Sequence, residues 1–381
     1  MNVMRKLRGA ASAGSVSGSS SGTSTANNSS PGSSRNGTDA GAPTAANGRN
    51  AEEALMDARV QVSLTTLKKL FNEYTHPREP LSEQERDDKL YEMLPLFCKV
   101  FSSCPSNDMS EKFWDVVAFC QQVSRLMVSE IRKRASNQST EAASIAIVKF
   151  LEVETTEETS SGWMLLATLN LLANGDVSLI QVMTAAAVPS TLVKCLYLFF
   201  DLPIVEDDEP SADGGAVSEF NAHERRTLLQ KVFVQLLVKL CSYPYPAEEL
   251  ARMDDLTLLF SAITSPCPIH NIVWRKNAAE ILTTISRNGL TDAVVSYIHS
   301  KGCMALCVDN MQRLTFGNPL EIVEMFVTVF CFLKDSSQVS QILMDDFRAS
   351  QGYVKKCHEM PMNAFPRGLT HGKTGDFAAN N

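Results

Sequence analysis

Three metal-ligand side chains recur at intervals of four in the carboxy-terminal third of the sequence: His299, Cys303 and Cys307. This spacing places side chains on one face of a helix, and zinc prefers imidazole and thiolate ligands. Zinc also needs a further ligand, and the nearby sequence supplies none. Because Gly302 is expected to separate His299 from the two cysteines, we expect these side chains to pack structurally and to hold no metal.

A second chemical pattern, Gly368 followed by Gly372-Lys373-Thr374, resembles part of a phosphate-binding loop. That loop has four residues between its glycines and follows a buried strand, whereas here three residues intervene after no predicted strand. The sequence also contains no G-x-S-x-G or H-E-x-x-H motif. It therefore predicts a non-enzymatic protein without cofactors, and a hydrolase assembled from distant residues is the alternative.

A basic cluster is the first candidate contact point. Arg132, Lys133 and Arg134 precede Ser136, and this pattern is typical of sites for basophilic kinases. We therefore interpret Ser136 as a candidate phosphorylation site, with the phosphate expected near a helix start. The alternative is a solvated helix end, where the cations offset the negative pole of the helix.

An acidic cluster is the second candidate contact point. Glu206, Asp207, Asp208 and Glu209 lie in the segment 201–221, which is rich in Pro and Gly and is expected to form an exposed loop. A loop of this length often contacts a partner. Opposite charges on the basic and acidic clusters would give specificity to protein contacts.

The overall composition limits the partners. The 381 residues are 44 % hydrophobic and carry a net charge of −8, so we expect a real core and no nucleic-acid or anionic-membrane surface. Ten cysteines occur without a CxxC pair, which favours free thiols in a reducing compartment. No window approaches the length of uncharged apolar chain that spans a membrane, so no membrane insertion is expected.

Helical periodicity dominates the sequence after residue 60. Apolar side chains fall at intervals of three and four, and we find no long alternating run, so the sequence predicts an all-α protein. Ser82 and Glu85 form the spacing of a capping box at one helix start. Ser110 is expected to cap a later helix, with Phe113 and Val117 on its apolar face.

A repeat is visible in two stretches of the chain. Asn174-Gly175 and Asn288-Gly289 each end an apolar helix and precede two more, and we expect left-handed residues there. Their separation of 114 residues is near three units of about 38, close to the period of armadillo and HEAT arrays. We therefore predict an armadillo/HEAT-like helical-repeat solenoid, in which Ala278 and Ala279 are small because helices approach closely.

The predicted domain organisation has three parts. Residues 1–54 are rich in Ser, Gly and Asn and are expected to form a disordered tail, because they cannot bury enough apolar surface to offset chain entropy. Residues 55–354 form the repeat domain. Residues 355–381 have no apolar face and are expected to be a disordered or divergent tail.

Several stretches resemble the amino-terminal region of the large BEACH, WD40 and FYVE scaffold proteins, the family of the autophagy-linked FYVE protein and blue cheese. The resemblance covers about residues 62–354. The stretches that carry it are QVSRLMVSEIRKRASNQSTEAA, VPSTLVKCLYLFFDLP, LLQKVFVQLLVKLCS, PAEELARMDDLTLLFSAIT, WRKNAAEILTTISRNGL and PLEIVEMFVTVFCFLKDSSQVSQILMDDFRASQGY.

The resemblance implies a scaffold for selective autophagy of aggregated protein, cytoplasmic and partly nuclear, with roles in endolysosomal traffic and neuronal maintenance. Its partners would be autophagy or trafficking proteins. The lipid-binding FYVE module of the family is absent here, since the chain has no CxxC pair. The alternatives are a BEACH-family trafficking scaffold without an autophagy task and a short isoform that competes with its long version.

Overall fold

The computed structural model describes residues 45–102, 108–136, 138–153, 160–204, 221–314 and 319–350, with side chains from residue 57 onward. Throughout these ranges the regular structure is helical and no strand occurs, which confirms the all-α prediction. The chain divides into two compact units, one ending at Cys104 and the other beginning at Pro105.

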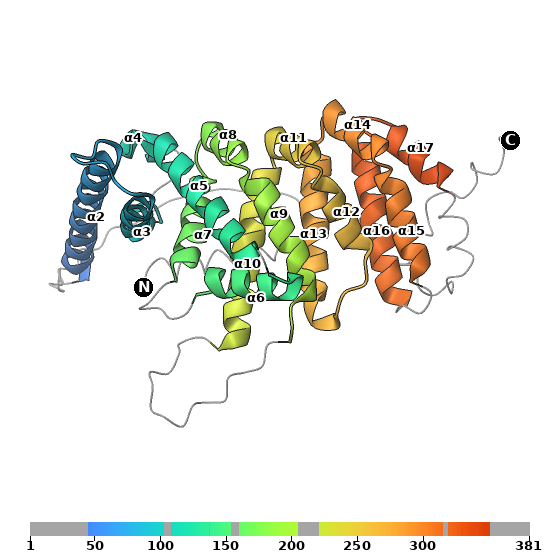
Figure 1. The fold of residues 1–381 in the computed structure, drawn as a ribbon. Helices are drawn as coiled ribbons and strands as arrows, with labels where there is room; N and C mark the ends of the chain where they lie inside the picture. The colour runs from blue at the N-terminus through green and yellow to red at the C-terminus, as the bar shows by residue number, and fades with distance from the viewer. Residues whose placement is uncertain are drawn as a thin grey trace, which may run out of the picture. The chain divides into compact units, whose positions relative to one another are not determined.

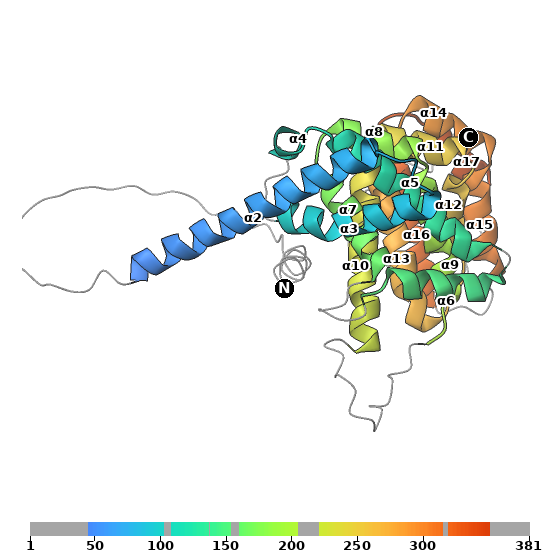
Figure 2. The ribbon, with the colours of Figure 1, turned by 60° about the vertical axis from the view of Figure 1, so that its left-hand side comes forward.

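The first unit is a pair of packed helices, α2 (Ala45–Thr75) and α3 (Glu83–Phe101), shown side by side in Figure 2. Helix α2 therefore begins inside the segment assigned to the amino-terminal tail. Phe71 and Phe97 are buried in this unit. The capping box is confirmed, because Ser82 Oγ accepts from the Glu85 backbone N–H and Glu85 Oε2 accepts from the Ser82 N–H.

The second unit contains the remaining described helices (Figure 1). Those before the 205–220 segment are α4 (Met109–Lys112), α5 (Val116–Ala135), α6 (Thr140–Leu151), α7 (Ser161–Leu172), α8 (Val177–Ala185), α9 (Val188–Leu198) and the 3-10 turn η3 (Phe199–Asp201). Those after it are α10 (Ala222–Cys241), α11 (Pro244–Arg252), α12 (Leu256–Thr264), η4 (Ile269–Asn271), α13 (Ile272–Thr284), the π-helical turn η5 (Ile285–Gly289), α14 (Asp292–Ser300), α15 (Cys303–Arg313), α16 (Pro319–Ser336) and α17 (Ile342–Ala349).

Helices of the second unit pack with the helix three places further along the chain. Helices α7, α10, α13 and α16 form one row of neighbours, α8, α11, α14 and α17 form a second, and α9, α12 and α15 form a third. The second row runs along one edge in Figure 1. This regular stacking is that of an armadillo-like solenoid with three helices per unit, as predicted.

A shared turn marks each three-helix unit. Helices α8, α11 and α14 each have nine residues. Each is followed by a left-handed residue, respectively Ala187, Asp254 and Gly302, and these are the described residues with positive φ. The turn redirects the chain from the second row into the third.

The predicted left-handed Asn-Gly caps are wrong, since neither Gly175 nor Gly289 has a positive φ. Gly289 instead lies at a close approach of backbone, whereas an added Cβ at Gly175 would come nearest to the end of the Leu179 side chain. A Cβ at Gly289 would lie 3.1 Å from Cys241 O and 3.2 Å from Tyr243 O, where the previous unit comes near. The two Asn-Gly pairs follow α7 and α13, so they are separated by two units rather than three.

Two local predictions are also corrected. Ser110 lies inside α4 and caps no helix; its hydroxyl donates to Asp176 Oδ2 at 3.0 Å. The chain breaks between α4 and α5, so Val116 is buried whereas Val117 is 42 % exposed. Periodicity did not reveal this break because Phe113, which directly follows α4, and Val116, which begins α5, are both buried.

Aromatic side chains fill the junctions between units. The centre of the Phe199 ring lies 4.8 Å from that of Trp274 and 5.4 Å from that of Phe233, so the end of α9, the middle of α10 and the start of α13 share one cluster. Such buried rings stabilise an interface through area and edge contacts. Within the described residues no single helix is long and apolar enough to span a membrane, although α8 and the α9–η3 segment pass that test together as a pair bent by 66°.

Candidate interaction surface on helix α5

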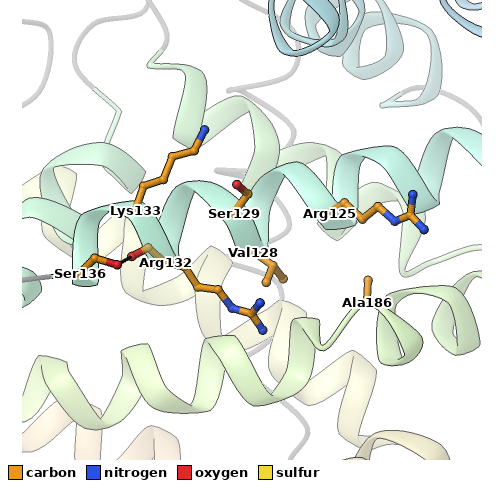
Figure 3. A pocket seen from close by; sticks show the side chains of 7 residues that line it. All are labelled: Arg125, Val128, Ser129, Arg132, Lys133, Ser136 and Ala186. Atoms are coloured by element: carbon orange, nitrogen blue, oxygen red, sulfur yellow. Dashed lines mark hydrogen bonds between the residues drawn. The ribbon is translucent and has the colours of Figure 1, made fainter. Parts of the chain in front are cut away.

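One face of α5 borders a shallow depression of about 380 Å³, which we call the α5 depression. Arg125, Ser129, Arg132 and Ser136 recur at intervals of three and four and therefore lie on the same side of the helix. Figure 3 shows these side chains together with the rest of the lining: Val128, Lys133 and Ala186.

Arg125, Arg132 and Lys133 are the exposed cations that line the α5 depression, and the two arginines have no ion pair within the described part of the chain. In Figure 3 Arg132 extends toward the side on which Ala186 lies, and Arg125 lies near Ala186 at the other end. Because the two arginines are seven residues apart, they are separated along the helix by about 10 Å. Their donors are therefore available to one ligand that spans the depression.

The other two predicted cations are engaged within the protein. Glu130 Oε1 lies 2.9 Å from Lys133 Nζ, and Glu130 Oε2 lies 2.6 Å from Arg134 Nη1. Partial burial works to raise the pKa of Glu130, but hydrogen bonds from Arg134 and Lys133 outweigh it and the pKa is lowered. The Arg134 guanidinium also lies 3.6 Å from the centre of the Phe150 ring. Arg134 therefore packs on α6 rather than facing a partner.

The α5 depression has a net positive charge. Ala186 ends α8, and the carboxy-terminal poles of α5 and α8 each contribute about half a negative unit charge. The two full charges of Arg125 and Arg132 exceed this contribution. Sequence reasoning missed Arg125, which the spacing from Arg132 could have indicated.

Ser136 is exposed at the carboxy-terminal end of α5, where its hydroxyl donates to the Arg132 carbonyl at 2.7 Å. The alternative of a helix end with cations in its last turn describes this position, and the next helix start, that of α6, follows within four residues. Helix α6 is capped by Ser139, whose Oγ accepts from the Ala142 N–H at 3.3 Å. A phosphate on Ser136 would add negative charge to the lining of the α5 depression.

The acidic residues Glu206, Asp207, Asp208 and Glu209 lie outside the described residues. Their role in contacts stays a prediction.

The His299, Cys303 and Cys307 set is divided by a turn, as predicted, because Gly302 adopts a left-handed conformation between α14 and α15. Cys303 and Cys307 are buried, and burial raises the pKa of both thiols, which disfavours thiolate ligands. His299 is exposed, with Nδ1 2.8 Å from Asp346 Oδ2. Among the described residues no group of three His, Cys, Asp or Glu side chains is placed to hold a metal.

A pair of buried carboxylates joins two successive units. Glu249 from α11 and Asp255 at the start of α12 are 2 % and 4 % exposed. Glu249 Oε2 accepts from the Ser190 N–H of α9 at 3.2 Å, and Asp255 Oδ2 accepts from the Ser190 hydroxyl at 2.5 Å. Lys194 Nζ lies 3.1 Å from Asp255 Oδ2. The pair therefore fixes the amino-terminal end of α9.

Glu249 is the less satisfied carboxylate of this pair. Its Oε1 is buried with no described hydrogen-bond partner, beside a cavity of about 400 Å³ between α8 and α11. Burial and the neighbouring Asp255 carboxylate raise the pKa of Glu249 to about 7. Perturbed acids often indicate active sites, but this one accepts from a backbone N–H at a packed junction, which is a structural role.

In sequence, the chain is similar to part of much longer proteins. It is 27 % identical over 291 residues to the human WD repeat- and FYVE domain-containing protein 4, covering 75 % of this chain. It is 26 % identical over 278 residues to the mouse protein of the same name, covering 73 % of this chain. The chain spans 8 % of the length of each relative. No family model matches it, and no solved structure is significantly similar.

Proposed function

The chain is related to the WD repeat- and FYVE domain-containing proteins, and we propose that it is a non-enzymatic scaffold that binds other proteins in selective autophagy of aggregates. The observation that carries the proposal is the stack of three-helix units with an exposed cationic depression on α5. Solenoids present long surfaces without needing a reaction centre. This proposal places the chain in the cytoplasm and partly the nucleus, at autophagosomes or endolysosomes through partners.

The autophagy task in this proposal comes from the resemblance of the quoted stretches, and the protein-binding task comes from the geometry. The relatives' names specify WD repeats and FYVE domains, and the chain aligns to a small part of each relative. A trafficking scaffold without an autophagy task would use the same surface. The two proposals therefore differ in the partners that they predict.

Proximity labelling with the full chain distinguishes them. A biotin ligase fused to the chain should label autophagy receptors and autophagosome components more strongly than the ligase alone, and labelling should rise when aggregates accumulate. Labelling restricted to endosomal tethers would contradict the autophagy role and support the trafficking role. Turnover of generic ester or peptide substrates by the purified chain would contradict the non-enzymatic role.

A further inference from the structure

The partner chemistry of the α5 depression follows from two exposed arginines that are about 10 Å apart along one helix. We infer that the α5 depression docks an extended segment of a partner protein that carries two anionic side chains three residues apart. This inference rests on the proposed scaffold function. A segment in the polyproline II conformation has three residues per turn and rises about 3.1 Å per residue, so side chains three residues apart share one edge and lie about 9 Å apart. This spacing is close to the separation of Arg125 and Arg132 along the helix.

Arginine is suited to this contact. Its guanidinium donates two parallel hydrogen bonds to a carboxylate or phosphate, and such charge-assisted pairs are the stronger hydrogen bonds of proteins. The hydroxyl of Ser129, which also lines the α5 depression, adds a further hydrogen-bonding group to the lining. The apolar floor formed by Val128 and Ala186 gives the peptide backbone a surface to cover.

A protein segment fits better than a membrane or a nucleic acid. Recruitment by anionic lipid typically uses clusters of four to eight basic residues, whereas this face offers two unpaired arginines and Lys133, which is paired with Glu130. Nucleic-acid binding needs a broad basic stripe, and the chain has a net charge of −8. Two cations above an apolar floor suit a short peptide.

Fluorescence anisotropy with the full chain tests the inference. The probe is a fluorescein-labelled peptide of Gly, Ser and Ala with two phosphoserines three residues apart; the controls are its unphosphorylated form and a form with adjacent phosphoserines. Saturable binding is expected for the first probe, and about tenfold weaker binding for Arg125→Gln/Arg132→Gln. Equal binding of the adjacent form would overturn the spacing argument.

A matched variant controls for net charge. Arg313→Gln/Lys334→Gln removes the same charge from exposed positions on α15 and α16 and should bind the probe as the wild type does. Equal weakening in both double variants, or in neither, contradicts the inference. The inference is also contradicted if the chain does not bind the probe but binds phosphatidylcholine vesicles that contain phosphatidylserine, and if this binding depends on Arg125 and Arg132.

A charge swap guards against a folding defect. The Arg125→Glu/Arg132→Glu variant should no longer bind the phosphoserine probe. It should instead bind a peptide with two arginines three residues apart. Loss of the first probe without this gain overturns the docking geometry. If the probe fails to bind while proximity labelling still recovers autophagy components, the docking inference fails and the proposed function stands.

Discussion

Charged side chains in this protein divide into those that hold units together and those that are exposed for contacts. Glu249 and Asp255 are buried on the amino-terminal end of α9, whereas Arg125 and Arg132 are exposed without an ion pair in the described chain. The difference is burial: a buried carboxylate without full hydrogen bonding is costly, while an exposed cation is solvated and available.

Glu249 should give the fold a specific pH dependence. Its pKa is about 7 in the folded chain and 4.5 as the unperturbed reference, because burial and Asp255 disfavour the anion. The unfolded chain therefore loses this proton first, and stability falls as pH rises from 4.5 to 7, by roughly 3 kcal/mol in total. Glu249→Gln should remove this decline in denaturant unfolding measured across that range, and Glu248→Gln should keep it.

Ser136 should control the α5 depression. A negative charge at this position would lie in the lining of the α5 depression, reduce its positive charge and oppose the partner's anionic groups. Ser136→Glu should weaken binding of the phosphoserine probe several-fold, by the amount typical of one exposed charge pair, while Ser136→Ala binds normally. Unchanged anisotropy titrations for Ser136→Glu would contradict this role.

Glycines at the element scale have two different tasks. Gly162, in the first turn of α7, lies against α6: an added Cβ would be 2.2 Å from Phe150 O. Gly302 is left-handed, yet an added Cβ would meet nothing within 4 Å. The first glycine permits close packing of helices, and the second permits a turn.

Alanine at these two glycines should therefore have unequal effects. Gly162→Ala forces α6 and α7 apart and should cost roughly 3 kcal/mol, in the upper range for overpacking. Gly302→Ala adds only the strain of a left-handed residue, about 1 kcal/mol. Denaturant unfolding of both variants checks the order. A larger loss for Gly302→Ala would mean that the turn, rather than the close approach, limits stability.

The second unit as a whole is a one-dimensional stack, because each row connects a helix to the helix three places along. Ala278 is fully buried on α13, which packs against α10, α12 and α16, while Ala279 is half-buried. Stability in such a stack is a sum of unit and nearest-neighbour contributions. A destabilising substitution at one junction should therefore weaken only the helices that pack at that junction.

Ala278→Asp tests this locality. A carboxylate introduced there is buried without a partner and should cost on the order of 3–5 kcal/mol. Hydrogen exchange should speed up in α10, α12, α13 and α16 and remain slow in α5 and α6. Ala279→Asp, at the half-buried neighbour, should cost less. Uniform loss of protection across the whole second unit would contradict the nearest-neighbour account.

The sequence by itself determined the helices and their class, because apolar spacing and caps such as Ser82–Glu85 are local properties of the chain. It also located the basic cluster and the resemblance of α7–α9 to α13–α15. The sequence did not reveal α10–α12 as the unit between them. Asp254 takes the left-handed position in that unit, as Ala187 and Gly302 do in the other two, but it gives no recognisable signal in the sequence.

Only the tertiary structure decided which side chains are free for contacts and why the glycines are needed. Arg134 packs on Phe150 from the neighbouring helix, Arg125 joins Arg132 across two turns of α5, and Gly289 admits the end of α10. These outcomes depend on contacts between segments far apart in the sequence. Periodicity sets the buried face of a helix, but the neighbour that covers it sets the role of each remaining side chain.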